Sequence, residues 1–260
     1  MRSSDIKPKR SLGQNFLINQ GILDKIVQAA EVGPKDTVVE VGPGTGNLTR
    51  KLSEKAKRVV AVEKDHRLIE ELKEKFKNSN VEIIEEDILK LKAESLKLKV
   101  GEYKIVANIP FYITSHFLRT VFEEWPKPKL TVLTVQKEVA QRIVAKPPHM
   151  NLLALSVQFY SSPTITGYVS KGSFRPMPKV DSAIIKFIPK KDTSVNKDIF
   201  FKLIKAGFAG KRRQLANNLG KNLGLPKDKV IGILKELGLD EKIRAENLSI
   251  EKWVELSRFL

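Results

Sequence analysis

The chain contains no cysteine, and this absence excludes several kinds of site. Disulfide bonds, a thiolate nucleophile and a zinc site with cysteine ligands all need that residue. Histidine is scarce as well, because the 260 residues include only His66, His116 and His149, which form no cluster. We therefore expect no metal ion and no catalytic histidine, so that any chemistry must come from other side chains.

Long apolar runs are also absent. The strongest run, Leu130 to Val135, has the length of a strand and falls well short of the roughly 18–20 residues that cross a bilayer. The basic start of the chain is not followed by the apolar core of a signal peptide. We therefore expect no membrane segment and a cytoplasmic location.

Acidic residues are too few to balance the basic ones. The sequence has 47 Lys and Arg against 30 Asp and Glu, a formal net charge of +17. Lysines and arginines that lie close to phosphates gain from counterion release, so this charge favours a polyanionic partner. We expect that partner to be nucleic acid or the ribosome; the alternative is a solvated, lysine-rich surface.

Seven apolar, β-branched runs between residues 37 and 188 predict buried strands. They are 37–41, 58–63, 81–85, 103–107, 130–136, 164–169 and 183–188. Helical patterns precede or separate them, at 20–31, 47–56, 65–77, 114–123, 137–145 and 150–160. Because strands alternate with helices, we predict a doubly wound, mostly parallel sheet of seven strands in an α/β fold. A loop without a helix joins the last two strands, so one of them is a candidate for the antiparallel direction.

Residues 190–196 have the composition of a linker, and the rest of the chain shows only helical patterns. These patterns cover 197–209, 211–222, 227–237 and 249–259. Residues 190–260 carry 16 basic and 9 acidic side chains, a net charge of +7, so this part is about twice as basic per residue as the preceding 189 residues. We predict a sheet domain at 1–190 and a small all-helical, RNA-binding domain at 191–260.

A glycine-rich loop, Gly42-x-Gly44-x-Gly46, joins the first strand to a helix. Glycines at this place permit a tight turn and let backbone amides approach a ligand. Glu63 ends the next strand, 21 residues beyond Gly42, near the spacing at which a carboxylate accepts both hydroxyls of an adenosine ribose. Asp87, just past the third strand, is suited to accept a hydrogen bond from the adenine amine. The alternative for both acids is that they are ordinary charged residues at strand ends.

The spacing of these glycines separates two kinds of cofactor. The dinucleotide fingerprint is Gly-x-Gly-x-x-Gly, and here the third glycine comes one residue early, which disfavours nicotinamide and flavin cofactors. S-adenosylmethionine has a ribose and an adenine but no pyrophosphate, so its loop needs no full phosphate cradle. We therefore predict S-adenosylmethionine as the cofactor. Glu40, inside the first strand, is expected to brace the glycine loop or, alternatively, the methionine end of the cofactor.

The stretch Asn108-Ile109-Pro110-Phe111 follows the fourth strand, at the edge of the sheet where ligands bind. An adenine amine is a poor nucleophile, and two acceptors on its hydrogens would favour a tetrahedral nitrogen whose lone pair faces a methyl donor. The Asn108 oxygen and a backbone carbonyl near Ile109 or Pro110 are the candidate acceptors. Pro110 stiffens the loop, and Phe111 is suited to stack on a flipped base. The alternative is a strand-ending turn with an apolar anchor.

Two further aromatic residues are candidates for the same base. Phe174 precedes two prolines in a stiff loop, where it either stacks on the other face of the target base or belongs to the core. Tyr112 is a secondary stacking candidate. Because a sulfonium donor is already activated, positioning of the base supplies much of the catalysis, and the predicted site needs no strong general base.

Taken together, these motifs resemble those of the small-subunit (16S) ribosomal RNA adenine N6,N6-dimethyltransferases. The likeness runs from about Ser11 to beyond Leu219, and its motifs are 13–17, 39–46, 108–111, 174–182 and 207–219. It implies a Rossmann-like class I methyltransferase fold and contacts of S-adenosylmethionine with Asn15, Leu17, Gly42, Glu63, Asp87 and Asn108. It further implies dimethylation of two adjacent adenosines in the 3′-terminal hairpin loop of 16S rRNA, linked to small-subunit maturation, by a monomer.

The sequence departs from that family at two places. Phe111 stands where tyrosine is commoner, and the segment 146–150 is shorter than usual. Erythromycin-resistance methylases, which act on 23S rRNA, share the first motifs and the Asn-Ile-Pro-aromatic stretch. The loop 174–182 and the basic segment 207–219 favour the small-subunit enzyme. Two further hypotheses are a non-catalytic ribosome assembly factor and a dehydrogenase.

The basic segment carries the residues expected to bind RNA. Lys211, Arg212 and Arg213 would meet RNA phosphates there, by the same resemblance. The alternative is a solvated start of a helix.

Overall fold

The computed structural model describes residues 8–9, 12–191 and 195–259. Chain contacts divide the protein into two compact units. The sheet unit comprises Met1–Ala140 and Pro163–Pro189, and the helical unit comprises Gln141–Ser162 and Lys190–Leu260. The chain enters the helical unit for the last time between Pro189 and Lys190, one residue before the predicted boundary. Residues 141–162, which the predicted boundaries place with the sheet, group with the helical unit.

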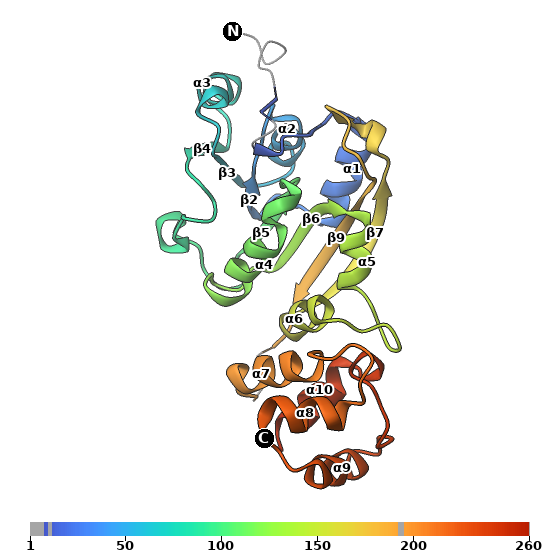
Figure 1. Ribbon diagram of the computed structural model, residues 1–260. Coiled ribbons are helices and arrows are strands. Elements are labelled where there is room, and N and C mark those ends of the chain that lie inside the picture. Colours follow the sequence, from blue (N-terminus) through green and yellow to red (C-terminus); the bar gives the residue numbers. More distant parts are fainter. Residues whose placement is uncertain (1–7, 10–11, 192–194, 260) are drawn as a thin grey trace. The chain divides into compact units, whose positions relative to one another are not determined.

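Seven strands form one sheet with the order β4-β3-β2-β5-β6-β9-β7 (Figure 1). They are β2 (Thr37–Val41), β3 (Arg58–Glu63), β4 (Val81–Glu85), β5 (Tyr103–Ala107), β6 (Leu130–Gln136), β7 (Ser161–Val169) and β9 (Ser182–Pro189). The pairs β2–β3, β2–β5, β3–β4 and β5–β6 are parallel, whereas β6 and β9 are antiparallel. The doubly wound, mostly parallel sheet and the antiparallel strand among the last two are thereby confirmed.

The central strands form because apolar, mostly β-branched residues follow one another without alternation. β2, β3 and β5 are buried over almost their whole length, as expected for parallel strands that are covered on both faces. The covering helices are α1 (Gln20–Ala29), α2 (Asn47–Ser53), α3 (His66–Lys75), α4 (Thr114–Glu123) and α5 (Lys137–Ile143). A short 3-10 helix, η3 (Ala93–Leu96), stands in the weakly periodic segment between β4 and β5.

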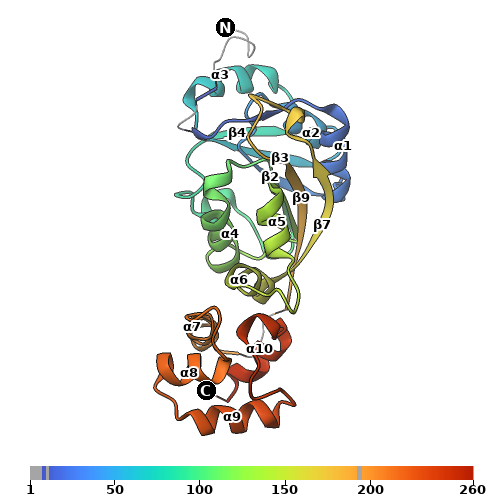
Figure 2. The same ribbon diagram turned by 45° about the vertical axis from the view of Figure 1, so that its right-hand side comes forward.

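The strand order reverses between β2 and β5, and this reversal positions the site. From β2 the chain passes through α2 to β3 on one side, and from β5 it passes through α4 to β6 on the other. Because such crossovers are right-handed, α2 and α4 must cover opposite faces of the sheet. Figure 2 shows α4 and α5 on one face and α1 on the other. The loops that follow β2 and β5 therefore separate and leave a crevice at the carboxyl ends of the strands.

A second, very small sheet closes one side of this crevice. β1 (Phe16–Leu17) pairs antiparallel with β8 (Phe174–Arg175), with Leu17 opposite Phe174. The amide of Ile18 donates to the carbonyl of Ser173 at 2.9 Å and extends the pairing. The sequence does not predict this sheet, because two-residue strands are too short to show a periodicity.

The helical unit has its own core. Its helices are α6 (Leu152–Tyr160), α7 (Lys197–Gly207), α8 (Leu215–Leu223), α9 (Lys227–Glu236) and α10 (Ile250–Ser257). Phe159 stacks on Phe200 with 4.3 Å between ring centroids, and the fully buried Trp253 stacks on Phe208 at 5.9 Å. Among the described helices of the chain, none is long and apolar enough to span a membrane.

One predicted helix begins later than expected. The pattern predicts a helix from residue 211, but α8 begins at Leu215. The Arg213 amide donates to the Gly210 carbonyl at 3.0 Å, and the Leu215 amide donates to the Ile243 carbonyl at 2.8 Å. These bonds close a turn over 210–213 and fix the first helical residue, so Lys211, Arg212 and Arg213 lie in a turn and outside the helix.

Candidate active site

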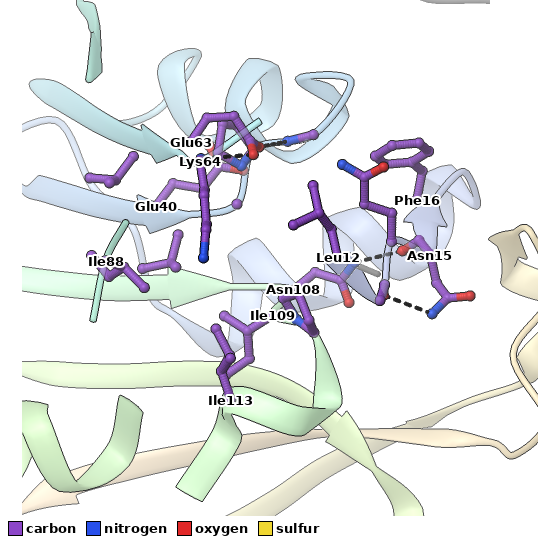
Figure 3. Close-up of a pocket in the computed structure, with 18 of the residues that line it drawn as sticks. Leu12, Asn15, Phe16, Glu40, Glu63, Lys64, Ile88, Asn108, Ile109 and Ile113 are labelled. Carbon is purple, nitrogen blue, oxygen red and sulfur yellow. Dashed lines mark hydrogen bonds between the residues drawn. The ribbon is translucent and has the colours of Figure 1, made fainter. Parts of the chain in front are cut away.

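A cavity of about 160 Å³ lies at the carboxyl ends of β2, β3 and β5 (Figure 3). Its walls come from the segment 12–17, the loop after β2, the ends of β3 and β4, and the loop after β5. The predicted cofactor residues Asn15, Leu17, Gly42, Gly44, Glu63, Asp87 and Asn108 all line it, and so do Pro110, Phe111 and Phe174. The fold therefore brings together residues from every motif that is predicted to bind the cofactor or the target base.

The glycine loop has the backbone that its sequence predicts. Gly42, Gly44 and Gly46 have φ angles of 68°, 58° and 76°, in the left-handed region that disfavours other residues. Position 44 also has no room for a side chain, because a Cβ on Gly44 would lie 2.8 Å from Cδ1 of Phe16. The loop can thus present its amides closely to a ligand while the N-terminal motif packs against it.

Glu63 holds the glycine loop at the end of β3. Its Oε2 accepts a hydrogen bond from the Gly44 amide at 3.1 Å, and its Oε1 accepts from the amides of Lys64 at 2.9 Å and Asp65 at 2.8 Å. Burial raises the pKa of Glu63, although these amides oppose that effect. A carboxylate has about four lone-pair directions, so three amides still leave one direction on Oε2 for a ligand hydroxyl.

Asp65 connects this corner to the N-terminal motif. Its Oδ2 accepts a hydrogen bond from Nε2 of Gln14 at 2.8 Å, and Arg67 donates to both of its oxygens. The guanidinium of Arg67, followed by Gln14, holds the pKa of this buried carboxyl well below its usual range, despite burial. The backbone amide of Lys9 donates to Oε1 of Gln14 at 2.7 Å. The sequence does not predict the contact of Gln14 with Asp65, because no local pattern relates two segments so far apart in the chain.

Glu40 is the most deeply buried acid of the cavity wall, with 1% of its surface exposed. Burial raises its pKa to about 8, the neighbouring Thr49 hydroxyl opposes this shift, and the nearby Glu63 adds to it. Within the described chain, its Oε2 has no hydrogen-bond partner. A buried carboxyl oxygen without a partner costs stability, which is consistent with a ligand that brings a hydrogen-bonding group into the cavity.

Asp87 forms an ion pair with Lys64 at the cavity wall. The ammonium of Lys64 lies 2.8 Å from its Oδ2, and the Leu89 amide donates to its Oδ1 at 3.1 Å. Burial alone would raise the pKa of Asp87, but the hydrogen bonds from Lys64 and the Leu89 amide, together with the positive charges of Lys64 and Lys90, outweigh burial and lower it. Figure 3 shows the Lys64 side chain extending from the end of β3 into the cavity. The predicted acceptor for the adenine amine is therefore paired with a lysine that no sequence motif singles out.

The motif after β5 is anchored at both ends. Asn108 donates its side-chain amide to the Asn15 carbonyl at 3.2 Å, which turns its side-chain oxygen away from that carbonyl. Ile109 is buried, with 2% of its surface exposed, and Phe111–Ile113 form the 3-10 helix η4. Pro110 has φ −55° and ψ 133°, so the chain is extended just before that turn.

Phe174 lines the cavity but has only 3% of its surface exposed. It belongs to the apolar cluster that also contains Leu17, Val169 and Ile184. This burial fits a core side chain that forms part of the wall. Its stacking on a target base remains a prediction.

The three basic residues predicted to bind RNA do not line the cavity. Lys211, Arg212 and Arg213 are exposed, in the turn between α7 and α8 of the helical unit. Among the described residues, no group of three or more His, Asp or Glu could hold a metal ion.

Comparison with known proteins identifies the family of the chain. The family model described as ribosomal RNA adenine dimethylase matches residues 6–260. The chain is 46% identical over 260 residues to ribosomal RNA small subunit methyltransferase A of Dehalococcoides mccartyi (strain CBDB1), covering 98% of this chain and 89% of that protein.

Two solved structures resemble it over nearly their full length. A dimethyladenosine transferase from Plasmodium falciparum superimposes with a TM-score of 0.80 and 33% identity, covering 93% of this chain and 95% of that one. The 23S rRNA methyltransferase ErmE gives a TM-score of 0.78 and 25% identity, covering 94% and 98%. With a family match that spans nearly the whole chain, this protein belongs to the ribosomal RNA adenine dimethylase family.

Proposed function

We propose that the chain dimethylates the N6 amines of two adjacent adenosines in the 3′-terminal hairpin loop of 16S rRNA, during maturation of the small ribosomal subunit. Its family makes it an rRNA adenine dimethylase whose methyl donor is S-adenosylmethionine. The choice of small-subunit RNA is supported by the 46% identity to a protein named for that subunit. The proposal includes action as a monomer in the cytoplasm, where the subunits mature.

One observation carries the proposal: Glu63 at the end of β3, Asp87 after β4 and Asn108 after β5 line a single cavity. We assign the free direction on Oε2 of Glu63 to a ribose hydroxyl and Asp87 to the adenine amine of the cofactor. The unpartnered Oε2 of Glu40 supports a ligand that brings hydrogen-bonding groups into the cavity, and S-adenosylmethionine has such groups. Asn15, Leu17, Gly42 and Gly44 are assigned to the remaining cofactor contacts.

The loop after β5 is assigned to the target adenine. S-adenosylmethionine, when bound, supplies a methyl group that its sulfonium already activates. The Asn108 oxygen and the backbone carbonyl of Ile109 or Pro110 accept hydrogen bonds from the target amine, so that its lone pair faces the donor. As the N–C bond forms, the amine loses one proton to solvent. Phe111, half-buried in the wall, stacks on the flipped base, and the stiff Pro110 holds these groups in register.

The helical unit is assigned to RNA. Lys211, Arg212 and Arg213 are exposed together in one turn, and residues 190–260 carry a net charge of +7. Adjacent cations in a turn are suited to phosphates, because each neutralised phosphate releases counterions.

The test is methyl transfer from labelled S-adenosylmethionine to three substrates: undermethylated 30S particles, 50S particles and free 23S rRNA. We expect label in the 30S particles, recovered as N6,N6-dimethyladenosine. Asn108→Ala should abolish transfer while circular dichroism and the unfolding midpoint stay close to those of the parent chain. Activity retained by Asn108→Ala would refute the role given to that residue.

The same experiment distinguishes the competing functions. Label in 23S rRNA alone would identify a large-subunit methylase and contradict the choice of substrate. Binding to 30S particles without any transfer would indicate an assembly factor that keeps the fold.

A further inference from the structure

Tyr112 combines exposure to solvent with a place in the cavity wall. Among the large apolar and aromatic side chains of the described residues, Tyr112 alone is both exposed and part of the cavity wall. Its surface is 63% exposed. Single exposed apolar residues are common and need no explanation. An exposed ring at the rim of a substrate cavity is different, because a bound substrate would cover it.

The ring is also held in place. A Cβ on Gly13 would lie 3.1 Å from Cε1 and 3.2 Å from Cδ1 of Tyr112, and 3.3 Å from Cβ of Pro110. Tyr112 therefore packs against the bare backbone of Gly13, which has a φ of 60°. Its own backbone belongs to η4, which is closed by a hydrogen bond from the Ile113 amide to the Pro110 carbonyl at 3.2 Å. A ring fixed in this way loses little entropy when a ligand covers it.

Its position in the chain identifies the ligand. Tyr112 directly follows Phe111, and adjacent Cα atoms are about 3.8 Å apart. We therefore take a base that stacks on Tyr112, while the target base stacks on Phe111, to come from a nearby nucleotide of the same strand. Every nucleobase has a π face, so an aromatic platform accepts any base.

We propose that Tyr112 is a second base-binding platform, which stacks on the nucleotide next to the target adenosine. This inference rests on the proposed function, in which an rRNA adenosine enters the cavity. Because two adjacent adenosines are modified, the base on Tyr112 would be the second adenosine while the first one reacts. The ring then keeps the two nucleotides apart and holds the strand in register.

The test measures kcat and KM for undermethylated 30S particles with Tyr112→Ala and Tyr112→Phe. Stacking on one base predicts a loss of about 5- to 100-fold in kcat/KM for Tyr112→Ala, mainly through KM, and recovery in Tyr112→Phe. The Kd for S-adenosylhomocysteine should stay within about twofold, which also shows that the variant is folded. Tyr168→Ala is the matched control, because Tyr168 is 54% exposed in the same unit and does not line the cavity.

A second measurement asks what the ring contacts. 30S particles are reconstituted with 16S rRNA that has an abasic nucleotide on the 5′ side, or on the 3′ side, of the target adenosine. On one of these substrates the parent chain should lose activity and become equal to Tyr112→Ala, because the base that the ring contacts is gone.

Three outcomes would overturn the inference while leaving the proposed function intact. They are full activity of Tyr112→Ala, an equal loss in Tyr168→Ala, and a Tyr112→Ala penalty that persists on both abasic substrates. If the parent chain transfers no methyl group to intact 30S particles, the proposed function fails first and this inference falls with it.

Discussion

Gln14 donates its side-chain amide to Asp65 at 2.8 Å, across 51 positions of the sequence. Asp65 caps α3, and its own amide donates to Glu63, whose other oxygen holds the Gly44 amide. Four residues from three segments thus form one hydrogen-bonded chain around the predicted ribose site. The N-terminal motif is therefore fixed to the residues it is proposed to assist.

Breaking the first link should weaken cofactor binding more than it weakens the fold. We expect Gln14→Ala to raise the Kd for S-adenosylhomocysteine about tenfold, since a hydrogen bond to a charged group contributes roughly 1.5–3 kcal/mol. Gln14→Glu should be worse, because it places a carboxylate beside Asp65. Titration calorimetry measures both, with the exposed Gln20→Ala as control. An unchanged Kd in Gln14→Glu would show that the link does not support the site.

Lys64 and Asp87 should respond in opposite directions. Lys64→Met keeps the aliphatic stem but removes the ammonium that occupies Oδ2 of Asp87, so S-adenosylhomocysteine should bind up to several-fold more tightly. The effect is small because Lys64 is half exposed, and such pairs contribute only about 0–1 kcal/mol. Asp87→Ala should instead weaken binding. Titration calorimetry measures the Kd for S-adenosylhomocysteine in each variant, with the exposed Lys57→Met as control. Weaker binding by Lys64→Met would mean that the lysine itself contacts the ligand.

Glu40 should make the chain less stable as the pH rises. Its folded pKa of about 8 lies above the ordinary value of 4.5, so between these values the folded chain keeps a proton that the unfolded chain has lost. Stability from this group is present below about pH 4.5 and is lost as the pH approaches 8. Glu40→Gln cannot ionise, so its free energy of unfolding relative to the parent should increase over this window, by up to a few kcal/mol.

Urea unfolding of the parent and Glu40→Gln at several pH values measures this difference. The exposed Glu94→Gln is the control. A difference that stays constant from pH 5 to 8 would contradict the assignment of a protonated Glu40.

Two glycines of the helical unit should respond oppositely to alanine. A Cβ on Gly207, the last residue of α7, would lie 2.3 Å from Cη2 of the fully buried Trp253, so Gly207→Ala should destabilise the chain by about 1–3 kcal/mol. Gly232, inside α9, has no neighbour within 4 Å of that position, so Gly232→Ala should stabilise by up to about 1 kcal/mol. Thermal unfolding compares the two, and equal effects would contradict the packing around Trp253.

Neutralising the basic turn should change the salt dependence of RNA binding. Replacing the three basic residues at 211–213 with glutamine should reduce the slope of log K for RNA binding against log salt concentration by up to about 3. The reason is that a phosphate no longer contacted by a cation keeps its counterions. The same change at exposed Lys25, Lys55 and Lys57 alters the net charge equally, in the sheet unit. Filter binding to 16S rRNA at several salt concentrations compares them. Identical slopes would show that charge alone matters and that the turn does not.

Much of the fold could be predicted because the relevant information is local. The β-branched runs of β2, β3 and β5 identify buried strands, and the positive φ angles of the glycine loop follow from its composition. The meeting of Glu63 with Gly42 and Gly44 in one cavity follows from the spacing along two adjacent parallel strands.

The rest depends on contacts that no local pattern encodes. Gln14 reaches Asp65, and Lys64 reaches Asp87, only after the sheet has formed, and an exposed lysine looks the same in sequence whether or not it is paired. The start of α8 differs from its prediction because the helical pattern of 211–222 hides a turn that is set by a bond to Ile243.

The pairing of β1 with β8 makes the length of the N-terminal motif as important as its composition. Leu17 faces Phe174 in a sheet only two residues long, and a shift of one residue in such a pairing turns each side chain to the opposite face. An inserted residue between Asn15 and Ile18 would therefore withdraw Leu17 from the cavity wall and expose it, even with every original residue still present. We therefore expect this strand to tolerate exchanged side chains better than added or removed residues.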